Sequence, residues 1–402
     1  MGNILGGVCM VDFMSEAMNI KSELINIRRD IHENPELGFE EYRTSKIIQE
    51  YLKKEGIDFY SVAETGVCAE IKGEGRGKKV IALRADMDAL LIDEKTDCEY
   101  KSKIKGKMHA CGHDAHTAIL LGAAKILNKN KKYFSGTVKL LFEPAEETTG
   151  GALIMINEGV LREPYVERIV GLHVSEDLDC GKIGVKLDMV NAASNPFTIR
   201  VKGKGGHGAH PDKTVDPIVV TSNVVMAIQT IASREVAPVN PVVITIGSIN
   251  GGTAPNIIPE EVTLSGIIRT ITREDRVYVV KRLEEIIDGV CSALRAEGRV
   301  VVEEGYPCLY NDKEMVRRVK KIGKRIVGER NVLEQENPSM GVESFAYFAQ
   351  ERPSVFYYLG TKNKKKGADK PAHSNLFKID EEALPIGVAM QCAIAFDYLT
   401  SL

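Results

Sequence analysis

Three of the eight histidines lie in one short run, HACGHDAH, between His109 and His116. Cys111 and His113 stand two residues apart in this run, directly before an apolar stretch with helical spacing. Thiolate and imidazole groups bind zinc and related metals, and Asp114 or His116 could add a ligand. The alternative is the start of a helix that Asp114 caps, with His109 in the core. The density of ligand types favours a metal site, although the spacing matches no general zinc motif.

Two adjacent carboxylates, Glu146 and Glu147, follow a predicted strand that ends at Pro144. Neighbouring side chains in an extended segment point in opposite directions. One glutamate can therefore bind a metal ion while the other faces a water molecule. The alternative is an acidic first turn of the next helix, which the helix dipole favours. The position of the pair at the carboxyl end of a strand favours the catalytic interpretation.

Two further histidines follow short apolar segments, His173 in GLHV and His373 in AHSNLF. Taken alone, each histidine is more typical of a core or loop residue whose ring nitrogens have ordinary hydrogen-bond partners. With the earlier residues they exceed the ligands that one zinc with an open position needs. Two metal ions that share a bridging ligand would use all of them, and such a pair activates water for hydrolysis. The candidate ligands are Cys111, His113, Glu147, His173 and His373.

Carboxylates also end the predicted strand that starts at Val80, in the motif LRADMDAL. Asp86 and Asp88 lie where they can orient ligating imidazoles through hydrogen bonds to the second ring nitrogen. We therefore expect these carboxylates next to the metal ligands.

A second set of polar residues lies further along the chain, around glycine-rich loops. His207 falls in GKGGHGAHP, Asn256 in GGTAPNIIPEE, and Arg269 near the end of the following strand. Turn glycines with surface polar side chains are one interpretation, an anion-recognition surface is the other, and the residues alone favour neither. For recognition, Asn256 and Arg269 are candidates to hold the polar end of a substrate, because a guanidinium matches the two oxygens of a carboxylate.

The pattern of elements predicts how these residues are positioned. Helix-like and strand-like stretches alternate over the first half of the chain, which is typical of an α/β domain with a largely parallel sheet. In such sheets the loops beyond the carboxyl ends of the strands carry the chemistry. From about Pro196 the order becomes β-α-β-β-α-β, as in a ferredoxin-like unit. We therefore predict a catalytic domain over 15–194 and 305–402, interrupted by an inserted α+β domain over 195–304.

Composition excludes several classes of protein. The chain has 402 residues, of which 44% are hydrophobic and 27% charged, and its net charge is −3. These values exclude wholesale disorder and a dedicated nucleic-acid binder. We expect no membrane span, because the apolar runs are too short, and no secretory signal, because no basic residue precedes Lys21. The eight scattered cysteines lack a CxxC pair and predict a reduced, cytoplasmic protein.

Taken in order, the motifs resemble those of the metal-dependent amidohydrolases of the aminoacylase and carboxypeptidase G type, in particular the hippurate hydrolase and auxin-conjugate (indole-acetyl-amino acid) hydrolase branch. The resemblance runs from about Ile25 to the C-terminus, and it is specific because long motifs agree in order and spacing. The motifs are RRDIHENPELGFEE, LRADMDALLI, MHACGHDAHTAILLGAAKIL, FEPAEE, GLHV, GKGGHGAHP, GGTAPNIIPEE, SGIIRT and AHSNLF.

The resemblance implies a two-metal, aminopeptidase-like catalytic domain and an inserted lid domain through which two subunits pair. By motif position it implies that the five candidate ligands bind the metals, that Glu146 is the general base and that Asp88 orients a ligand. It implies that Asp86 is not a ligand, although related enzymes outside this branch carry a histidine there. His207 is expected to stabilise the oxyanion in the partner subunit's site. Ser344 stands where relatives often have aspartate, in a GxEDF motif.

We therefore expect hydrolysis of the amide bond of an N-acyl amino acid or short peptide-like conjugate, with release of a free amino acid and a carboxylic acid. The expected cofactors are two divalent metal ions per subunit, zinc first, with manganese, cobalt or nickel as alternatives. The expected partners are a small-molecule substrate and a second copy of the chain, in a homodimer or dimer-based oligomer, without nucleic acid or membrane. Three alternatives are an N-acetyl-diaminopimelate deacetylase, an aminopeptidase, and a non-catalytic metal- or peptide-binding protein on the same scaffold.

Overall fold

The computed structural model describes residues 4–5, 8–9, 11–148 and 150–401. Part of the N-terminal stretch that bears on a secretory signal therefore lies outside the described residues. The chain divides into two compact units, and each is described by itself. The first unit comprises Met1–Asp188, Tyr310–Glu336 and Tyr347–Leu402, and the second comprises Met189–Leu309 and Asn337–Ala346.

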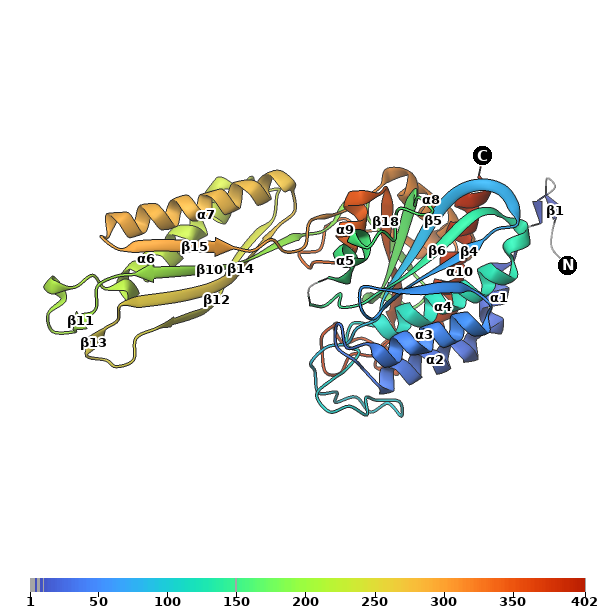
Figure 1. Cartoon of the computed structure of the whole chain (residues 1–402), viewed down its shortest axis with the longest axis horizontal. Coiled ribbons are helices and arrows are strands. Elements are labelled where there is room, and N and C mark those ends of the chain that lie inside the picture. The colour runs from blue at the N-terminus through green and yellow to red at the C-terminus, as the bar shows by residue number, and fades with distance from the viewer. Residues whose placement is uncertain (1–3, 6–7, 10, 149, 402) are drawn as a thin grey trace. The chain divides into compact units, whose positions relative to one another are not determined.

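A mixed eight-stranded sheet forms the centre of the first unit, with helices packed against it (Figure 1). The strands follow the order β17 (Val332–Glu334), β8 (Ile183–Val185), β18 (Ser354–Lys362), β7 (Arg168–Asp179), β5 (Gly75–Asp86), β6 (Ser135–Glu143), β4 (Gly66–Lys72) and β3 (Asp58–Val62). The four central neighbours β18, β7, β5 and β6 are parallel, as the alternation of elements predicts. Towards the edges, β8, β4 and β3 pair antiparallel with a neighbour.

The helices of the first unit pack against that sheet or, as α1 and α2 do, against the helices α4 and α10. Two of them, α4 and α10, are apolar almost all round and contact both β5 and β6, so they lie in the core. The helices are α1 (Phe13–Asn19), α2 (Lys21–Glu33), α3 (Tyr42–Lys54), α4 (His113–Lys129), α5 (Gly151–Asn157), α8 (Lys313–Ile326) and α10 (Leu384–Thr400). The short strands outside the two large sheets form two-stranded pairs: β1 (Ile4–Leu5) with β2 (Val8–Cys9), β9 (Asp188–Asn191) with β16 (Leu309–Asn311), and β11 (Gly206–His207) with β13 (Ile257–Ile258).

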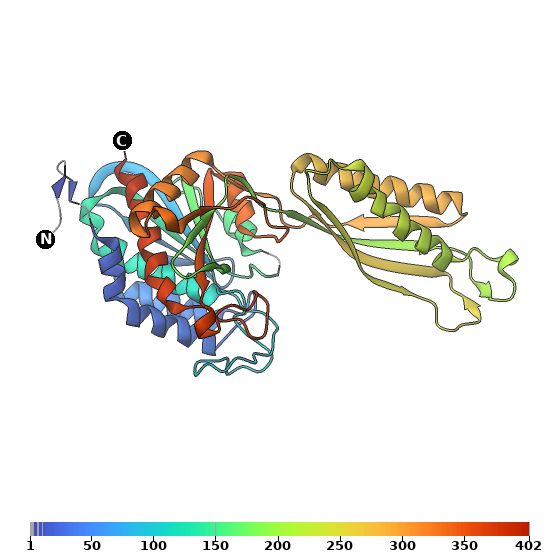
Figure 2. The ribbon, with the colours of Figure 1, turned by 180° about the vertical axis from the view of Figure 1, so that it is seen from behind.

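The C-terminal helix corrects one sequence-based expectation. Within the described chain, Glu381–Thr400 is long and apolar enough to cross a membrane, so the expectation that every apolar run is too short is wrong. Most of this stretch is buried inside the first unit, where α10 (red in Figure 2) packs against α1, α4 and α8. The apolar composition of α10 is therefore explained by its burial in the core of the first unit.

The register of the parallel strands places polar residues in one row at the carboxyl edge of the sheet. Asp86 of β5 pairs with Glu143 of β6. Arg84 of β5 pairs with Gly171 of β7, so His173 lies level with Asp86. The loops that follow these strands carry the remaining site residues of the first unit.

The second unit is a four-stranded antiparallel sheet with two helices on one face. The strand order is β12 (Val242–Gly251), β14 (Glu261–Thr270), β10 (Ala193–Lys202) and β15 (Glu297–Val302). The chain path β10-α6-β12-β14-α7-β15, with α6 (Pro217–Thr230) and α7 (Arg273–Ala293), is the predicted ferredoxin-like one. Alternate residues of β10, namely Phe197, Ile199 and Val201, are buried in the core that the helices cover.

The segment Asn337–Ala346 belongs to the second unit, although the sequence pattern placed it in the catalytic domain. The cause is backbone pairing, because the Ala192 N–H donates to the carbonyls of Ser339 at 3.0 Å and Gly341 at 3.1 Å. Ser344, at the position of the usual aspartate, lies in this segment and is fully buried. The segment leads into α9 (Phe345–Glu351).

Candidate metal centre

The first unit brings the five candidate ligands together from separate elements. Two groups of three ligand atoms each lie within 4.8 Å of one another: Cys111 with His113 and His173, and Cys111 with Glu147 and His373. Cys111 Sγ is 3.5 Å from His173 Nε2, and Glu147 Oε1 is 3.2 Å from His373 Nε2. Glu147 Oε1 also lies 3.8 Å from His113 Nε2. Cys111 belongs to both groups of ligand atoms. Two neighbouring groups of this kind are the arrangement that a pair of metal ions needs.

The imidazoles of buried His113 and partly buried His173 each have a ring nitrogen free for a metal. His113 donates from Nδ1 to Asp88 Oδ1 at 3.0 Å, and its Nε2 is buried without a hydrogen-bond partner among the described residues. His173 donates from Nδ1 to the Val174 carbonyl at 2.7 Å, so its Nε2 lone pair faces Cys111. An oxygen behind the imidazole and an open Nε2 are typical of a ligating histidine. The residues present therefore fit a metal centre.

Gly112 sets the direction in which Cys111 and His113 leave the chain. It precedes the first residue of α4 with a φ of 90°, in the left-handed region that favours glycine. A Cβ at this position would lie 2.3 Å from Val174 Cγ2. Both the backbone conformation and the space around it therefore require glycine.

Asp88 holds two of the candidate ligands at once. Its Oδ1 accepts from His113, and its Oδ2 accepts the backbone N–H of Glu147 at 2.9 Å. The side chain is buried, so neither bond competes with bulk water. Asp88 thus has the place that the sequence predicts for an orienting carboxylate.

Asp86 and His116 are bonded mainly to each other, although Asp86 Oδ2 also lies 3.7 Å from His113 Nε2. His116 Nδ1 lies 2.6 Å from Asp86 Oδ1, and His116 Nε2 accepts the Val174 N–H at 2.9 Å. Both ring nitrogens of His116 are therefore in use. Burial outweighs the nearby carboxylate and lowers the pKa of His116 to about 4, so the ring is neutral.

Arg84 joins the carboxylates at the ends of β5 and β6. Its Nη1 is 2.6 Å from Asp86 Oδ2 and its Nε is 2.6 Å from Glu143 Oε2, with all three side chains fully buried. Burial alone would raise the pKa of Asp86. The Arg84 guanidinium, the His113 imidazole and the hydrogen bond with His116 outweigh burial and hold that pKa well below its ordinary value.

We expect Arg84→Met to lower the free energy of unfolding by about 3–5 kcal/mol, because it leaves two buried carboxylates without their cation. Arg43→Met is the control, since Arg43 pairs with Asp30 at 2.8 Å on the surface. Loss of that pair should change stability by at most about 1 kcal/mol. Urea unfolding followed by circular dichroism measures both variants, and equal losses would contradict the role given to Arg84.

The glutamate pair lies in a turn, so the prediction that it occupies an extended segment is wrong. Ala145 has a φ of 56°, and its carbonyl accepts the Gly150 N–H at 3.0 Å, which turns the chain back. Both carboxylates consequently lie near one imidazole: Glu146, Glu147 and His113 offer ligand atoms within 4.8 Å of one another. Glu146 is only 6% exposed, so a buried carboxylate stands beside the candidate ligands.

The second unit carries the three residues predicted to contact substrate. His207 is exposed, and its Nδ1 accepts the Ala209 N–H at 3.1 Å. The Gly208 N–H donates to the Asn256 carbonyl at 2.8 Å, which brings the His207 and Asn256 loops together. Arg269 lies apart from these loops in β14, half-buried, and its Nη1 has no hydrogen-bond partner in the part of the chain that the structure describes.

A further group, His32, Glu94 and Cys98, also offers ligand atoms within 4.8 Å. His32 Nδ1 is 2.7 Å from Asp114 Oδ2, and its Nε2 is 3.4 Å from Glu94 Oε1. Burial and Arg28 lower the pKa of His32, but the two carboxylates outweigh them and raise it. Because each ring nitrogen of His32 already lies next to a carboxylate, hydrogen bonding explains this group without a metal. Asp114, offered by the sequence as a helix cap, pairs with Arg28 and His32 instead.

Sequence reasoning missed Glu41 and Arg84, which are both buried next to the site. Arg84 carries a usable signal, because a charge inside an otherwise apolar strand must find a partner when it is buried. Glu41 accepts the Ala145 N–H at 2.8 Å. It lies in NPELGFEE, a motif to which the sequence assigns no role.

Comparison with known proteins decides the family. Residues 82–397 match the sequence profile of peptidase family M20/M25/M40. The chain belongs to this family. The IAA-amino acid hydrolase ILR1-like 4 of Arabidopsis thaliana is 41% identical over 384 residues, 94% of this chain and 86% of the relative. Thermostable carboxypeptidase 2 of Saccharolobus solfataricus is 41% identical over 389 residues, 96% of this chain and 97% of the relative.

A solved structure shows the same fold. A Bacillus subtilis protein described as a dinuclear metal-binding peptidase from the M20 family has a TM-score of 0.84 at 33% identity, covering 96% of this chain and 100% of that one. The predicted resemblance and the α/β catalytic fold with an inserted domain are therefore confirmed. This M20/M25/M40 peptidase is a metal-dependent amidohydrolase.

Proposed function

We propose that this enzyme hydrolyses the amide bond of an N-acyl amino acid, or of a short peptide-like conjugate with a free carboxylate. The products are a free amino acid and a carboxylic acid. The observation that carries the proposal is a buried Glu146 within 4.8 Å of ligand atoms of His113 and Glu147, in the cluster that also holds Cys111. Relatives named for acting on an amino acid conjugate and as a carboxypeptidase support the substrate class.

The protein's own groups have distinct tasks in this reaction. Two divalent metals, when bound by the five ligands, supply Lewis acidity that makes water nucleophilic at neutral pH. Glu146 takes the proton of the attacking water and delivers it to the leaving amine. Asp88 keeps His113 and the backbone of Glu147 in place through its two hydrogen bonds.

We propose that the second unit supplies the groups that bind the substrate's oxygens. Because His207 Nδ1 accepts the Ala209 N–H, the neutral ring carries its proton on Nε2 and can donate to an oxyanion. The unpartnered Nη1 of Arg269 suits a carboxylate, and Asn256 adds an amide near His207. We propose that His207 acts in the partner subunit's site.

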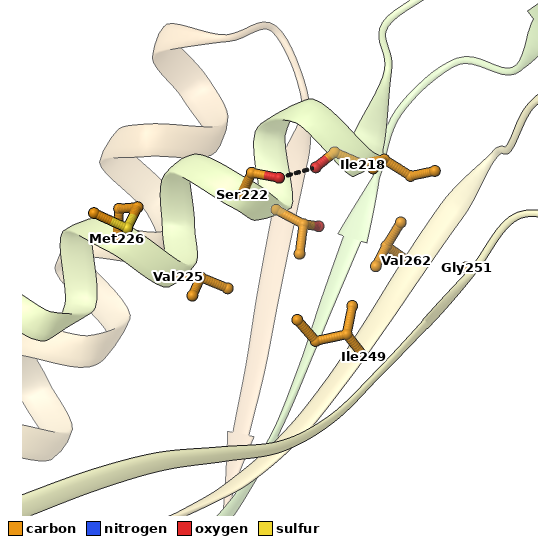
Figure 3. Close-up of a pocket in the computed structure, with 8 residues that line it drawn as sticks. Ile218, Ser222, Val225, Met226, Ile249, Gly251 and Val262 are labelled. Carbon is orange, nitrogen blue, oxygen red and sulfur yellow. Dashed lines mark hydrogen bonds between the residues drawn. The ribbon is translucent and has the colours of Figure 1, made fainter.

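Two copies of the chain would pair through the second unit. β12 ends the described sheet, so one side of its backbone lacks a partner strand there. Beside it, residues of α6, β12 and β14 line an apolar pocket of about 380 Å³ (Figure 3). Ile218, Met226 and Ile249 line this pocket and are exposed, Met226 by 72%. A second copy would cover these side chains and give a two-fold dimer.

We propose zinc as the native metal. One buried thiol and three imidazoles among the five ligands suit a borderline-soft ion with nitrogen and sulfur ligands. Manganese, cobalt and nickel are the alternatives, and metal analysis of natively expressed protein distinguishes them.

We propose a cytoplasmic location. No disulfide joins any of the seven cysteines whose side chains the structure describes. Cysteines without disulfides are typical of a reducing compartment.

The test of the function is a screen of N-acetyl, N-benzoyl and longer N-acyl amino acids against metal-reconstituted protein, with N-acetyl-diaminopimelate included. We expect release of the free amino acid from at least one N-acyl series, and release at least about a hundredfold slower by the Glu146→Gln variant. Absence of release from every substrate would contradict the proposal. Selective cleavage of N-acetyl-diaminopimelate would replace it with the deacetylase alternative.

The thiol of Cys111 gives a test of metal binding that needs no substrate. Burial, with Glu147 beside it, raises the pKa of this thiol well above its ordinary value. A bound metal would block the sulfur, so alkylation should be slow in the metal-loaded enzyme and faster after chelation. Peptide mass spectrometry measures the labelling, with the partly exposed Cys98 as control. Labelling of Cys111 that is equally fast with and without metal would show that it is not a ligand.

A further inference from the structure

A buried carboxylate connects the N-terminal part of the first unit to the glutamate pair. Glu41, in the motif NPELGFEE, has no exposed surface. Its Oε1 accepts the Ala145 N–H at 2.8 Å, and its Oε2 accepts the Thr65 hydroxyl at 2.5 Å. Both oxygens thus have fixed partners, and one partner is the residue directly before Glu146.

Ala145 needs such a partner because of its backbone conformation. A φ of 56° lies in the left-handed region, which residues with a Cβ rarely adopt. A buried backbone N–H without an acceptor would carry a further penalty. Glu41 therefore stabilises the turn conformation in which Glu146 lies beside His113.

Two carboxylates accept hydrogen bonds from backbone N–H groups on either side of Glu146. Glu41 accepts from Ala145, and Asp88 accepts from Glu147 at 2.9 Å. Glu146 lies between these two fixed points. The carboxylates come from different parts of the chain, so the direction of the Glu146 side chain depends on both.

The same motif packs directly on the turn. A Cβ on Gly38 would lie 2.8 Å from Ala145 Cβ and 2.9 Å from Ala145 Cα. A side chain at Gly38 would therefore displace the turn. NPELGFEE contacts Ala145 through one hydrogen bond and through close backbone packing.

We propose that Glu41 is a positioning residue, which acts through the Ala145 N–H to fix the direction of Glu146. This inference rests on the proposed role of Glu146 as general base. Misplacement of a catalytic group by about 1 Å can lower turnover about a hundredfold. The expected effect is therefore on kcat, with substrate binding and metal content preserved.

The test compares Glu41→Ala, Glu41→Gln and Glu36→Ala in the metal-loaded enzyme. Glu41→Ala should lower kcat about 10–100-fold, with KM within about twofold and metal content unchanged. Glu41→Gln should restore kcat to within about threefold, because an amide oxygen accepts the same N–H. Glu36 is the matched control, since its carboxylate accepts the N–H groups of Arg43 at 2.9 Å and Thr44 at 2.8 Å. Glu36→Ala should lower Tm and leave kcat unchanged.

Two results would overturn the inference: wild-type kcat in Glu41→Ala, or a loss that Glu41→Gln does not restore. If Glu41→Ala does not fold, Gly38→Ala takes its place, because it pushes on Ala145 and leaves the Glu41 carboxylate intact. It should show the same loss of kcat at constant KM, and wild-type kcat in this variant would equally overturn the inference.

A crystal structure of the Glu41→Ala enzyme gives a readout independent of turnover. In the enzyme as described, ligand atoms of Glu146, His113 and Glu147 lie within 4.8 Å of one another. In the variant, the Glu146 carboxylate should lie farther than this from the other two residues. An unmoved Glu146 would overturn the inference. If the wild-type enzyme cleaves no amide and Glu146 still moves in the variant, the proposed function fails while the positioning role stands.

Discussion

Glu146→Gln is expected to lower kcat by at least about a hundredfold while metal content stays at the wild-type level. The amide keeps the size of the side chain but cannot accept and return a proton. The turn keeps its other anchors, because Glu41 and Asp88 hold the amides on either side of this residue. Turnover of the best substrate from the screen and elemental analysis of the purified protein measure the two quantities.

Glu147→Ala is the matched comparison for that variant. Glu147 Oε1 lies 3.2 Å from His373 Nε2 and 3.8 Å from His113 Nε2, so its removal should reduce metal content as well as turnover. Equal metal loss in both variants would contradict the division of roles within the pair. An undiminished kcat in Glu146→Gln would remove that residue from the chemistry.

An equal mixture of Glu146→Gln and His207→Ala subunits is expected to regain activity that neither variant has alone. The two residues lie on different units of the chain, and we propose that His207 serves the partner's site. In a mixed dimer, one site then carries both defects. The other site receives Glu146 from one chain and His207 from its partner. Random reassortment makes about half of the dimers mixed, so about a quarter of all sites should be active.

Co-expression, or joint unfolding and refolding, prepares the mixture, and turnover per subunit is measured. The control is a mixture of Glu146→Gln and Glu147→Ala. Both of these changes lie in the first unit, so every site in that mixture keeps one defect. Activity of the test mixture no higher than the average of its parents would show that His207 acts in its own subunit or takes no part in catalysis.

The clustering of the candidate ligands could be predicted in part, because some of their signals are local. Cys111 and His113 are ligand types close together in sequence, and the glutamate pair follows a strand. Parallel register then brings strand ends together, as it does for Asp86 of β5 and Glu143 of β6. The alternation of elements is enough to predict that arrangement.

The turn at Ala145 could not be predicted, because alanine carries no signal for a left-handed conformation. Its partner Glu41 lies 104 residues earlier, and a single sequence does not reveal such a contact. The pairing of Ala192 with Ser339 and Gly341 escaped prediction for the same reason. Long-range hydrogen bonds to the backbone thus account for both the wrong geometry at the glutamate pair and the unexpected segment in the second unit.

Gly112 limits how this centre can be redesigned. Its φ of 90° and the 2.3 Å approach of Val174 Cγ2 to a Cβ are independent restrictions. A smaller residue in place of Val174 would relieve the crowding but would leave the penalty for a positive φ. No single compensating substitution therefore allows another residue at position 112. Directed evolution toward a different metal preference should therefore diversify Cys111 and His113 and keep the glycine between them invariant.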